Sequence, residues 1–160
     1  MRTYITQQEI SRVLDYLERE VKRTKERLIA APEEGSPTDL KLSEATIQDI
    51  QLELIRRTDF NLFDGPDVVE SLLANRSLWQ AVLMTRMSES GLIHLRDLPD
   101  NLWNVDTLCI LATDERAAHK LAELGESWQA DVVNVHTLEA TGGTIGDSEP
   151  SGPLVTMWWD

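Results

Sequence analysis

Residues 107–136 read TLCILATDERAAHKLAELGESWQADVVNVH, and this stretch decides the predicted fold. Its first seven residues are almost continuously apolar, which is typical of a strand that is covered on both faces. Asp114 then has the position of a helix N-cap, and apolar residues recur at helical spacing to about residue 127. Residues 132–136 are rich in valine and predict a second strand. Strand, helix and strand within about thirty residues predict a βαβ unit with parallel strands.

The sequence on both sides of this unit extends the prediction to a domain over residues 61–160. Residues 154–159, LVTMWW, predict a last strand, and the glycine- and proline-rich stretch 141–153 predicts a loop before it. Helical patterns near 66–86, the first capped by Asp64 and the second by Ser77, and over 114–127 would cover the sheet. The predicted fold class is therefore α/β, with mixed α+β as the alternative. The sheet would be small and mostly parallel, with strands 107–113, 132–136 and 154–159 and with 92–95 as a candidate fourth strand.

The first 60 residues predict a separate helical hairpin. Apolar residues recur every three or four positions across 6–30 (Ile10, Leu14, Leu17, Val21 and Leu28), and Thr6 and Glu9 have the spacing of a capping box. Residues 43–57, capped by Ser43, predict the second helix. The apolar stripe of 6–30 would be covered by that helix, by a partner helix, or by a second copy of the chain in a homodimer.

Charge is divided unevenly between these two parts. Residues 1–60 hold 10 Lys/Arg and 12 Asp/Glu, whereas residues 61–160 hold 5 Lys/Arg and 16 Asp/Glu. This acidity argues against nucleic acid and against anionic membrane surfaces, which bind through Lys and Arg. It favours a protein partner with a basic surface. The alternative is that the acidity is a compositional background that only keeps the protein soluble, as in a salty cytoplasm.

Cysteine usage and hydropathy indicate a cytoplasmic protein. Cys109 is the single cysteine and lies in an apolar run, so we expect it to be inert core rather than a nucleophile. The N-terminal residues lack the apolar stretch of a signal peptide, and no run approaches the ~20 apolar residues of a membrane span.

A site at the carboxyl ends of the strands is the catalytic alternative. Asp114 would follow one strand, and His136 and Thr137 would follow the next, near the Gly142–Gly143 loop. These residues would serve a small enzyme or a small-ligand sensor. Glu115, His119 and Glu123 share one helical face, but their spacing is more typical of solvated surface pairs than of a metal site. We therefore predict no metal and no cofactor.

The sequence favours a non-catalytic function, because no recognised catalytic or nucleotide-binding motif occurs in it. The candidate partner-binding residues are Asp97, Asp100 and Trp103, together with Trp158 and Trp159 at the end of the sequence. Exposed tryptophans are frequent anchors of interfaces, and carboxylates around them would form a charged rim. The leading hypothesis is a protein–protein interaction module of the adaptor, inhibitor, immunity or antitoxin kind, which uses its acidic surface and its helical apolar stripe.

Overall fold

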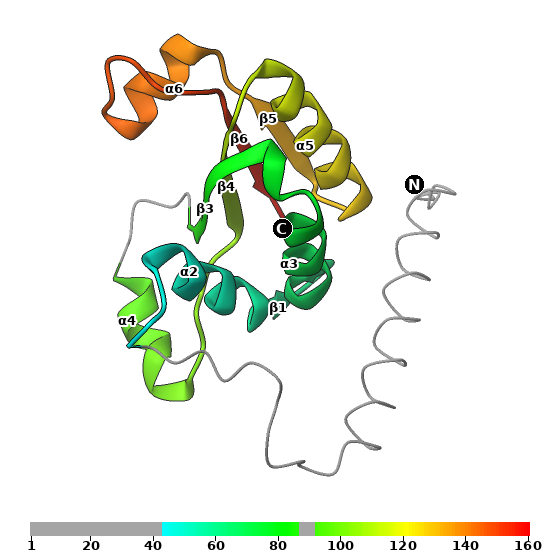
Figure 1. The fold of residues 1–160 in the computed structure, drawn as a ribbon. Coiled ribbons are helices and arrows are strands. Elements are labelled where there is room, and N and C mark those ends of the chain that lie inside the picture. The colour runs from blue at the N-terminus through cyan, green and yellow to red at the C-terminus, as the bar shows by residue number, and fades with distance from the viewer. Residues whose placement is uncertain (1–42, 87–91) are drawn as a thin grey trace, which may run out of the picture. The chain divides into compact units, whose positions relative to one another are not determined.

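The computed structural model describes residues 43–86 and 92–160, which belong to one compact unit, Leu42–Asp160 (Figure 1). The helix predicted over 6–30 lies outside the described residues, so the predicted hairpin and the 1–60 domain stay predictions. The described helices are α2 (Ile47–Arg56), α3 (Gly65–Ala74), α4 (Ile93–Asp97), α5 (Glu115–Ser127) and α6 (Leu138–Ile145), with short 3-10 helices η1 (Arg76–Leu78) and η2 (Leu98–Asp100). The strands are β1 (Asp59–Phe60), β2 (Phe63–Asp64), β3 (Trp79–Thr85), β4 (Thr107–Ala112), β5 (Val132–Val135) and β6 (Leu154–Trp158).

Side-chain caps fix where four of these helices begin. The side chains of Thr46, Asp64, Asp114 and Thr137 accept hydrogen bonds from backbone N–H groups three residues further on. Such bonds satisfy N–H groups that the helix itself leaves without partners. The caps predicted at Asp64 and Asp114 are confirmed. The predicted Ser43 cap is wrong, because Thr46 and Asp49 form a capping box three residues later.

Four strands form one antiparallel sheet in the order β3-β4-β6-β5. The strands predicted at 107–113, 132–136 and 154–159 are present, but the predicted mostly parallel sheet with a βαβ unit is wrong. The last strand, β6, lies between β4 and β5 and pairs antiparallel with both. β4 and β5 consequently run in the same direction without touching, as in a split βαβ arrangement.

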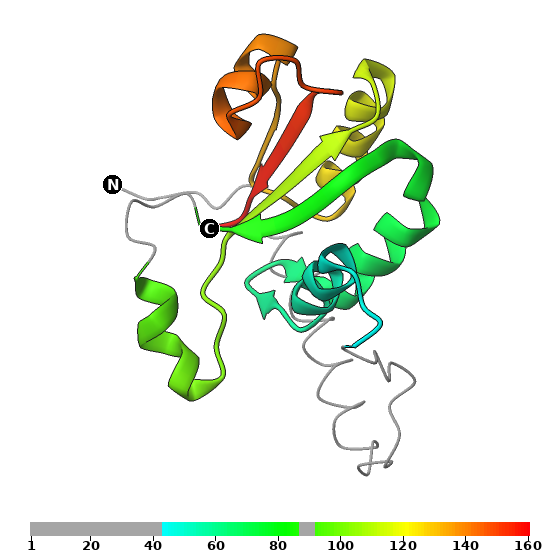
Figure 2. The same cartoon turned by 60° about the vertical axis from the view of Figure 1, so that its left-hand side comes forward.

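One face of the sheet carries the core, beneath α5 and beside α2 and α3 (Figure 2). The pairing register aligns Val82, Ile110 and Val155 in one row on this face, and Met84, Leu108 and Met157 in the next. All six side chains are at most 3% exposed. Trp79, Phe63 and Trp159 join them, so the small sheet and the three helices share a single hydrophobic cluster.

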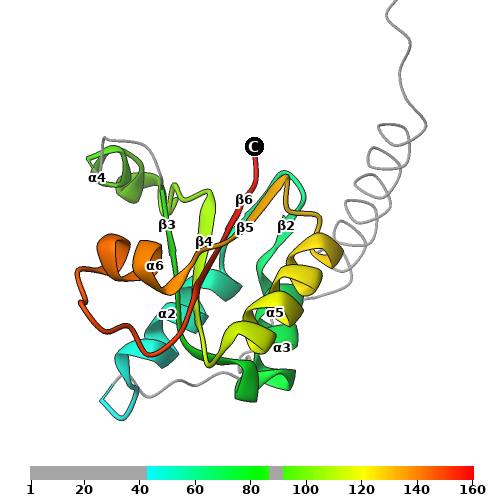
Figure 3. The same ribbon diagram turned by 90° about the horizontal axis from the view of Figure 1, so that it is seen from above.

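The opposite face of the sheet is called the open face below. The register places eleven residues on it: Ala81, Leu83, Thr85, Thr107, Cys109, Leu111, Val132, Asn134, Leu154, Thr156 and Trp158. Helix α6 lies on this side of the sheet and α5 on the other (Figure 3). The Thr141 hydroxyl of α6 accepts a hydrogen bond from the Leu154 backbone N–H at 2.8 Å, so α6 covers one end of this face.

Three predicted elements outside the βαβ region are corrected. Residues 78–83 are not a helix but mostly strand β3. A register shift after Trp79 puts an extra residue into this strand. This bulge places Trp79 and Val82 on one face at a spacing that resembles a helix. Residues 92–95 are not a strand, because Leu92 is a turn residue and residues 93–95 belong to helix α4.

The third correction concerns the predicted 141–153 loop, whose first part is helix α6. Gly142 allows the Asp147 carbonyl oxygen to approach to 2.4 Å from where a Cβ would stand. Gly146 ends the helix with a φ of +74°, a conformation that glycine adopts readily. The glycines that suggested a loop therefore lie within a short helix and at its end.

Within the described residues, no helix is long and apolar enough to cross a membrane.

Candidate functional site

A groove of about 1020 Å³ lies where four segments of the described chain meet. Its lining comes from the end of α2 with the β1–β2 hairpin, from Arg86 after β3, from α4 and the following residues to 106, and from the last three residues, 158–160. The volume is at the upper end of that of small-ligand sites.

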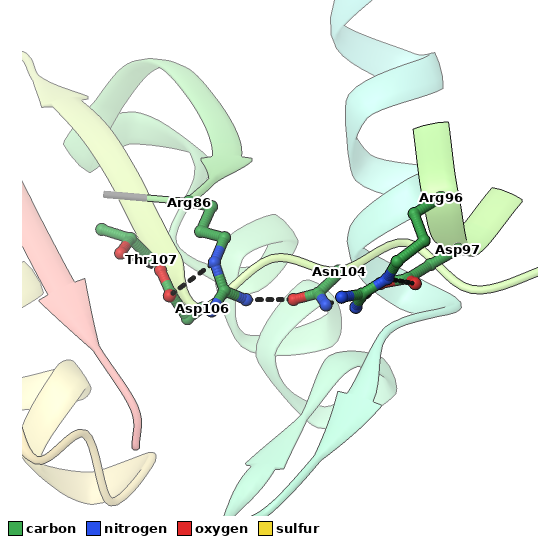
Figure 4. A network of polar contacts seen from close by, with 6 residues as sticks. All are labelled: Arg86, Arg96, Asp97, Asn104, Asp106 and Thr107. Carbon is green, nitrogen blue, oxygen red and sulfur yellow. Dashed lines mark hydrogen bonds and ion pairs between the residues drawn. The ribbon is translucent and has the colours of Figure 1, made fainter. Parts of the chain in front are cut away.

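A network of polar contacts holds one wall of the groove (Figure 4). Arg86 donates from Nη1 to Asn104 Oδ1, and Asn104 Nδ2 donates to Asp97 Oδ2 at 2.7 Å. Arg96 donates to both Asp97 oxygens, from Nε at 2.5 Å and from Nη2 at 2.9 Å. These contacts join the end of β3 to α4 and fix the Asp97 carboxylate at the rim.

A second carboxylate continues the same network toward the sheet. Arg86 Nε lies 3.9 Å from Asp106 Oδ2, and Thr107 donates to Asp106 Oδ1 at 2.6 Å. Two fixed carboxylates, Asp97 and Asp106, therefore line the groove together with Asp59 and Asp160, against the guanidinium groups of Arg57 and Arg86. The formal charge of these lining groups is negative.

We predict that the pKa of Asp97 depends on the hydrogen bonds of this network. Its hydrogen bonds with Arg96 and Asn104 lower the pKa from 3.8 to about 2. Because the folded-state pKa is depressed, the stabilisation that these contacts provide is complete above about pH 4 and is lost as the pH falls through about 2. An NMR titration of the Asp97 carboxyl carbon should give a pKa of about 2, and Asn104→Ala should raise it. A wild-type value near 3.8 would contradict the network.

Four exposed leucines stand beside the groove, on the segment 92–102, which is called the leucine arm below. They are Leu92, Leu95, Leu98 and Leu102, with exposed fractions of 75%, 67%, 56% and 59%. The arm consists of α4, η2 and the adjoining residues, and its helix stands away from the sheet (Figures 1 and 2). Exposed apolar side chains gathered on one short segment are typical of an interaction surface.

The groove brings together most of the predicted partner-binding residues. Asp97, Trp103, Trp158 and Trp159 all line it. Trp103 and Trp158 are half-buried, whereas Trp159 is 1% exposed and belongs to the core beneath the groove. Asp100 is exposed in η2, within the arm, and does not line the groove. The structure thus brings Trp103 and Trp158, from distant parts of the chain, to the lining of one groove.

The residues of the catalytic alternative have structural contacts. Asp114 accepts the Ala117 N–H at 2.7 Å and caps α5, while Thr137 caps α6. His136 Nε2 lies 2.9 Å from the Thr156 hydroxyl on the side of the sheet opposite the core. None of these three residues lines the groove. In residues 43–86 and 92–160, no group of three or more His, Cys, Asp or Glu side chains is placed to hold a metal ion.

Sequence reasoning missed the leucine arm and the roles of Arg86 and Asn104. The signal for the arm was present, because leucines at 92, 95, 98 and 102 are three or four residues apart. A strand assignment for 92–95 hid that spacing. The contact between Arg86 and Asn104 joins residues 18 apart and depends on the tertiary structure, so no local pattern predicts it.

Compared with known proteins, the chain matches no protein-family model, no curated protein and no solved structure.

Proposed function

We propose that this protein is a non-catalytic protein–protein interaction module that binds a basic, partly apolar segment of another protein at the groove and the leucine arm. The function would be that of an adaptor or inhibitor, including the immunity and antitoxin kinds. The observation that carries the proposal is the row of four leucines, each more than half exposed, beside a groove lined by carboxylates.

The exposed leucines and the carboxylates of the groove would contribute to binding in different ways. Burying apolar surface contributes about 25 cal/mol per Å², so the leucines and Trp103 would supply most of the affinity. Asp97 and Asp106 are held in place by hydrogen bonds before a partner arrives. Because four aspartates outnumber two arginines in the groove lining, its net negative charge would raise the association rate of a basic partner and select against an acidic one.

The proposal predicts that the full-length chain distinguishes two model peptides of about 20 residues. Both would be amphipathic helices with the same leucine stripe, one flanked by lysines and the other by glutamates. We expect the lysine peptide to bind at least tenfold more tightly, equivalent to about 1.4 kcal/mol, and to lose affinity as salt rises. Isothermal titration calorimetry at two salt concentrations measures both effects.

Variants of the arm locate the binding surface. Leu95→Ser and Trp103→Ala should each weaken the lysine peptide by about 1–2 kcal/mol, in the range of interface anchors. Leu73→Ser is the matched control, because Leu73 is 47% exposed on α3 and lies outside the arm and the groove. Equal binding of the two peptides, or equal losses in Leu95→Ser and Leu73→Ser, would contradict the proposal. Melting temperatures of the variants separate binding from stability.

A further inference from the structure

The open face of the sheet is uncharged in a strongly acidic chain. None of its eleven residues is Asp, Glu, Lys or Arg, although the whole chain has a net charge of −13. The groove, by contrast, carries carboxylates along its lining. The two surfaces share Trp158 but differ in charge, so they suit different partners.

Part of the open face is exposed although it is apolar. Leu83 of β3 is 44% exposed and Val132 of β5 is 43% exposed, while Cys109, Leu111 and Trp158 between them are half-buried. Leu154, whose N–H donates to Thr141 of α6, is 5% exposed, and Thr156, whose hydroxyl lies 2.9 Å from His136 Nε2, is 9% exposed. Thr107 is only 1% exposed. What stays exposed in the described structure is a mainly apolar surface beside α6 that is most exposed on the two edge strands, β3 and β5.

We propose that a second copy of this chain covers the open face, so that two sheets pack face to face. The absence of charged residues on the open face favours a second copy of the chain as the partner. Two acidic surfaces of the same chain would repel each other, whereas an uncharged face can approach its own copy without burying a charge. A basic partner, in turn, finds no carboxylate on this face to pair with. Sheets pack in this way in sandwich proteins, about 10 Å apart, with apolar side chains between them.

The exposed part of the face is small, so the dimer would be reversible. Stable interfaces use about 20–30 residues from each partner, whereas eight of the eleven open-face residues are exposed or half-buried, about a third of that number. We therefore expect the full-length chain to change from monomer to dimer, twice 18.1 kDa, as its concentration rises through the micromolar range. Sedimentation equilibrium measures this change.

Leu83→Lys is the decisive variant, because it separates a specific interface from general charge repulsion. Adding a lysine lowers the net negative charge, so nonspecific repulsion would decrease and association would strengthen. If the open face is the interface, the buried lysine should instead weaken the dimer at least tenfold. Leu73→Lys makes the same charge change at a leucine of similar exposure on α3 and should leave the dimer intact.

Cys109 provides an independent measurement on the unaltered protein. Its thiol lies on the open face and is partly exposed, and burial raises its pKa to about 11. Alkylation of this cysteine at a fixed pH should slow severalfold as the protein concentration rises through the dimer transition. The slowing should disappear in Leu83→Lys.

Three results would overturn the proposal. The first is a chain that stays monomeric at every concentration with unchanged Cys109 alkylation. The second is a dimer that resists Leu83→Lys but dissociates in Leu17→Asp, which would place the interface on the stripe predicted for residues 6–30. The third is a monomer whose melting temperature falls in Leu83→Lys, which would mean that the face is covered from within the same chain.

Discussion

Replacing Trp159 with alanine is expected to lower the free energy of unfolding by about 3–5 kcal/mol, the usual cost of removing a buried tryptophan. The indole is 1% exposed and lies edge-on against the Phe63 ring, with 4.8 Å between centroids. Its Nε1 donates to the Trp128 carbonyl oxygen at 3.2 Å, so the variant also leaves that carbonyl without its partner. Urea unfolding followed by circular dichroism measures the loss.

Trp158→Ala is the control for this experiment. The neighbouring indole is half-buried on the other face of β6, so its removal should cost clearly less stability. Equal losses in the two variants would contradict the assignment of Trp159 to the core and Trp158 to the open face.

Replacing Gly65 with alanine is expected to cost about 3 kcal/mol or more, above the usual range for adding one methyl group to a packed core. A Cβ at this position would stand 2.1 Å from the Ile55 carbonyl oxygen and 2.4 Å from that of Thr58. Both oxygens are backbone atoms, the first in the last turn of α2 and the second two residues after the helix ends, so neither can move without displacing the backbone there. The substitution should separate α2 from α3 and lower the melting temperature.

Gly143→Ala tests whether the Gly65 effect is steric. Gly143 lies in α6, and no atom of a neighbouring residue lies within 4 Å of the point where its Cβ would stand. Alanine favours helix over glycine by about 1 kcal/mol, so this variant should be neutral or more stable. A loss in Gly143→Ala as large as in Gly65→Ala would rule out the steric explanation.

The local elements of the fold were more predictable than their pairing. The apolar run before Asp114, the cap itself and the amphipathic helix after it lie in adjacent residues, so the sequence contains the whole signal for β4 and α5. The position of β6 depends instead on contacts between Leu108 and Met157, residues that are far apart in the chain. A strand can be inserted between two others without any change in their own patterns. The sequence therefore indicated which residues form strands but not which strands are neighbours.

The candidate site was predictable in part for the same reason. Trp103 and Asp97 could be predicted as candidates because an aromatic residue and a carboxylate near a proline turn are recognisable in the sequence itself. Their neighbours in the groove, Arg86 and Trp158, come from other segments, and only folding brings the four together. The leucine arm was missed because alternating and helical patterns cannot be distinguished over four residues such as 92–95.

Helix α2 affects whether another strand can be added at the edge of the sheet. The Gln48 side chain accepts the Val82 N–H at 2.9 Å and donates to the Val82 carbonyl at 2.8 Å, as the backbone of an adjoining strand would. The outer edge of β3 is thus occupied by an amide that belongs to no strand, whereas β5 ends the sheet on the other side. A sheet that is blocked on one edge can accept a strand on the other edge only. Filaments need a free sheet edge on both sides of every molecule, so this cap at Val82 disfavours open-ended stacking of sheets relative to closed pairs.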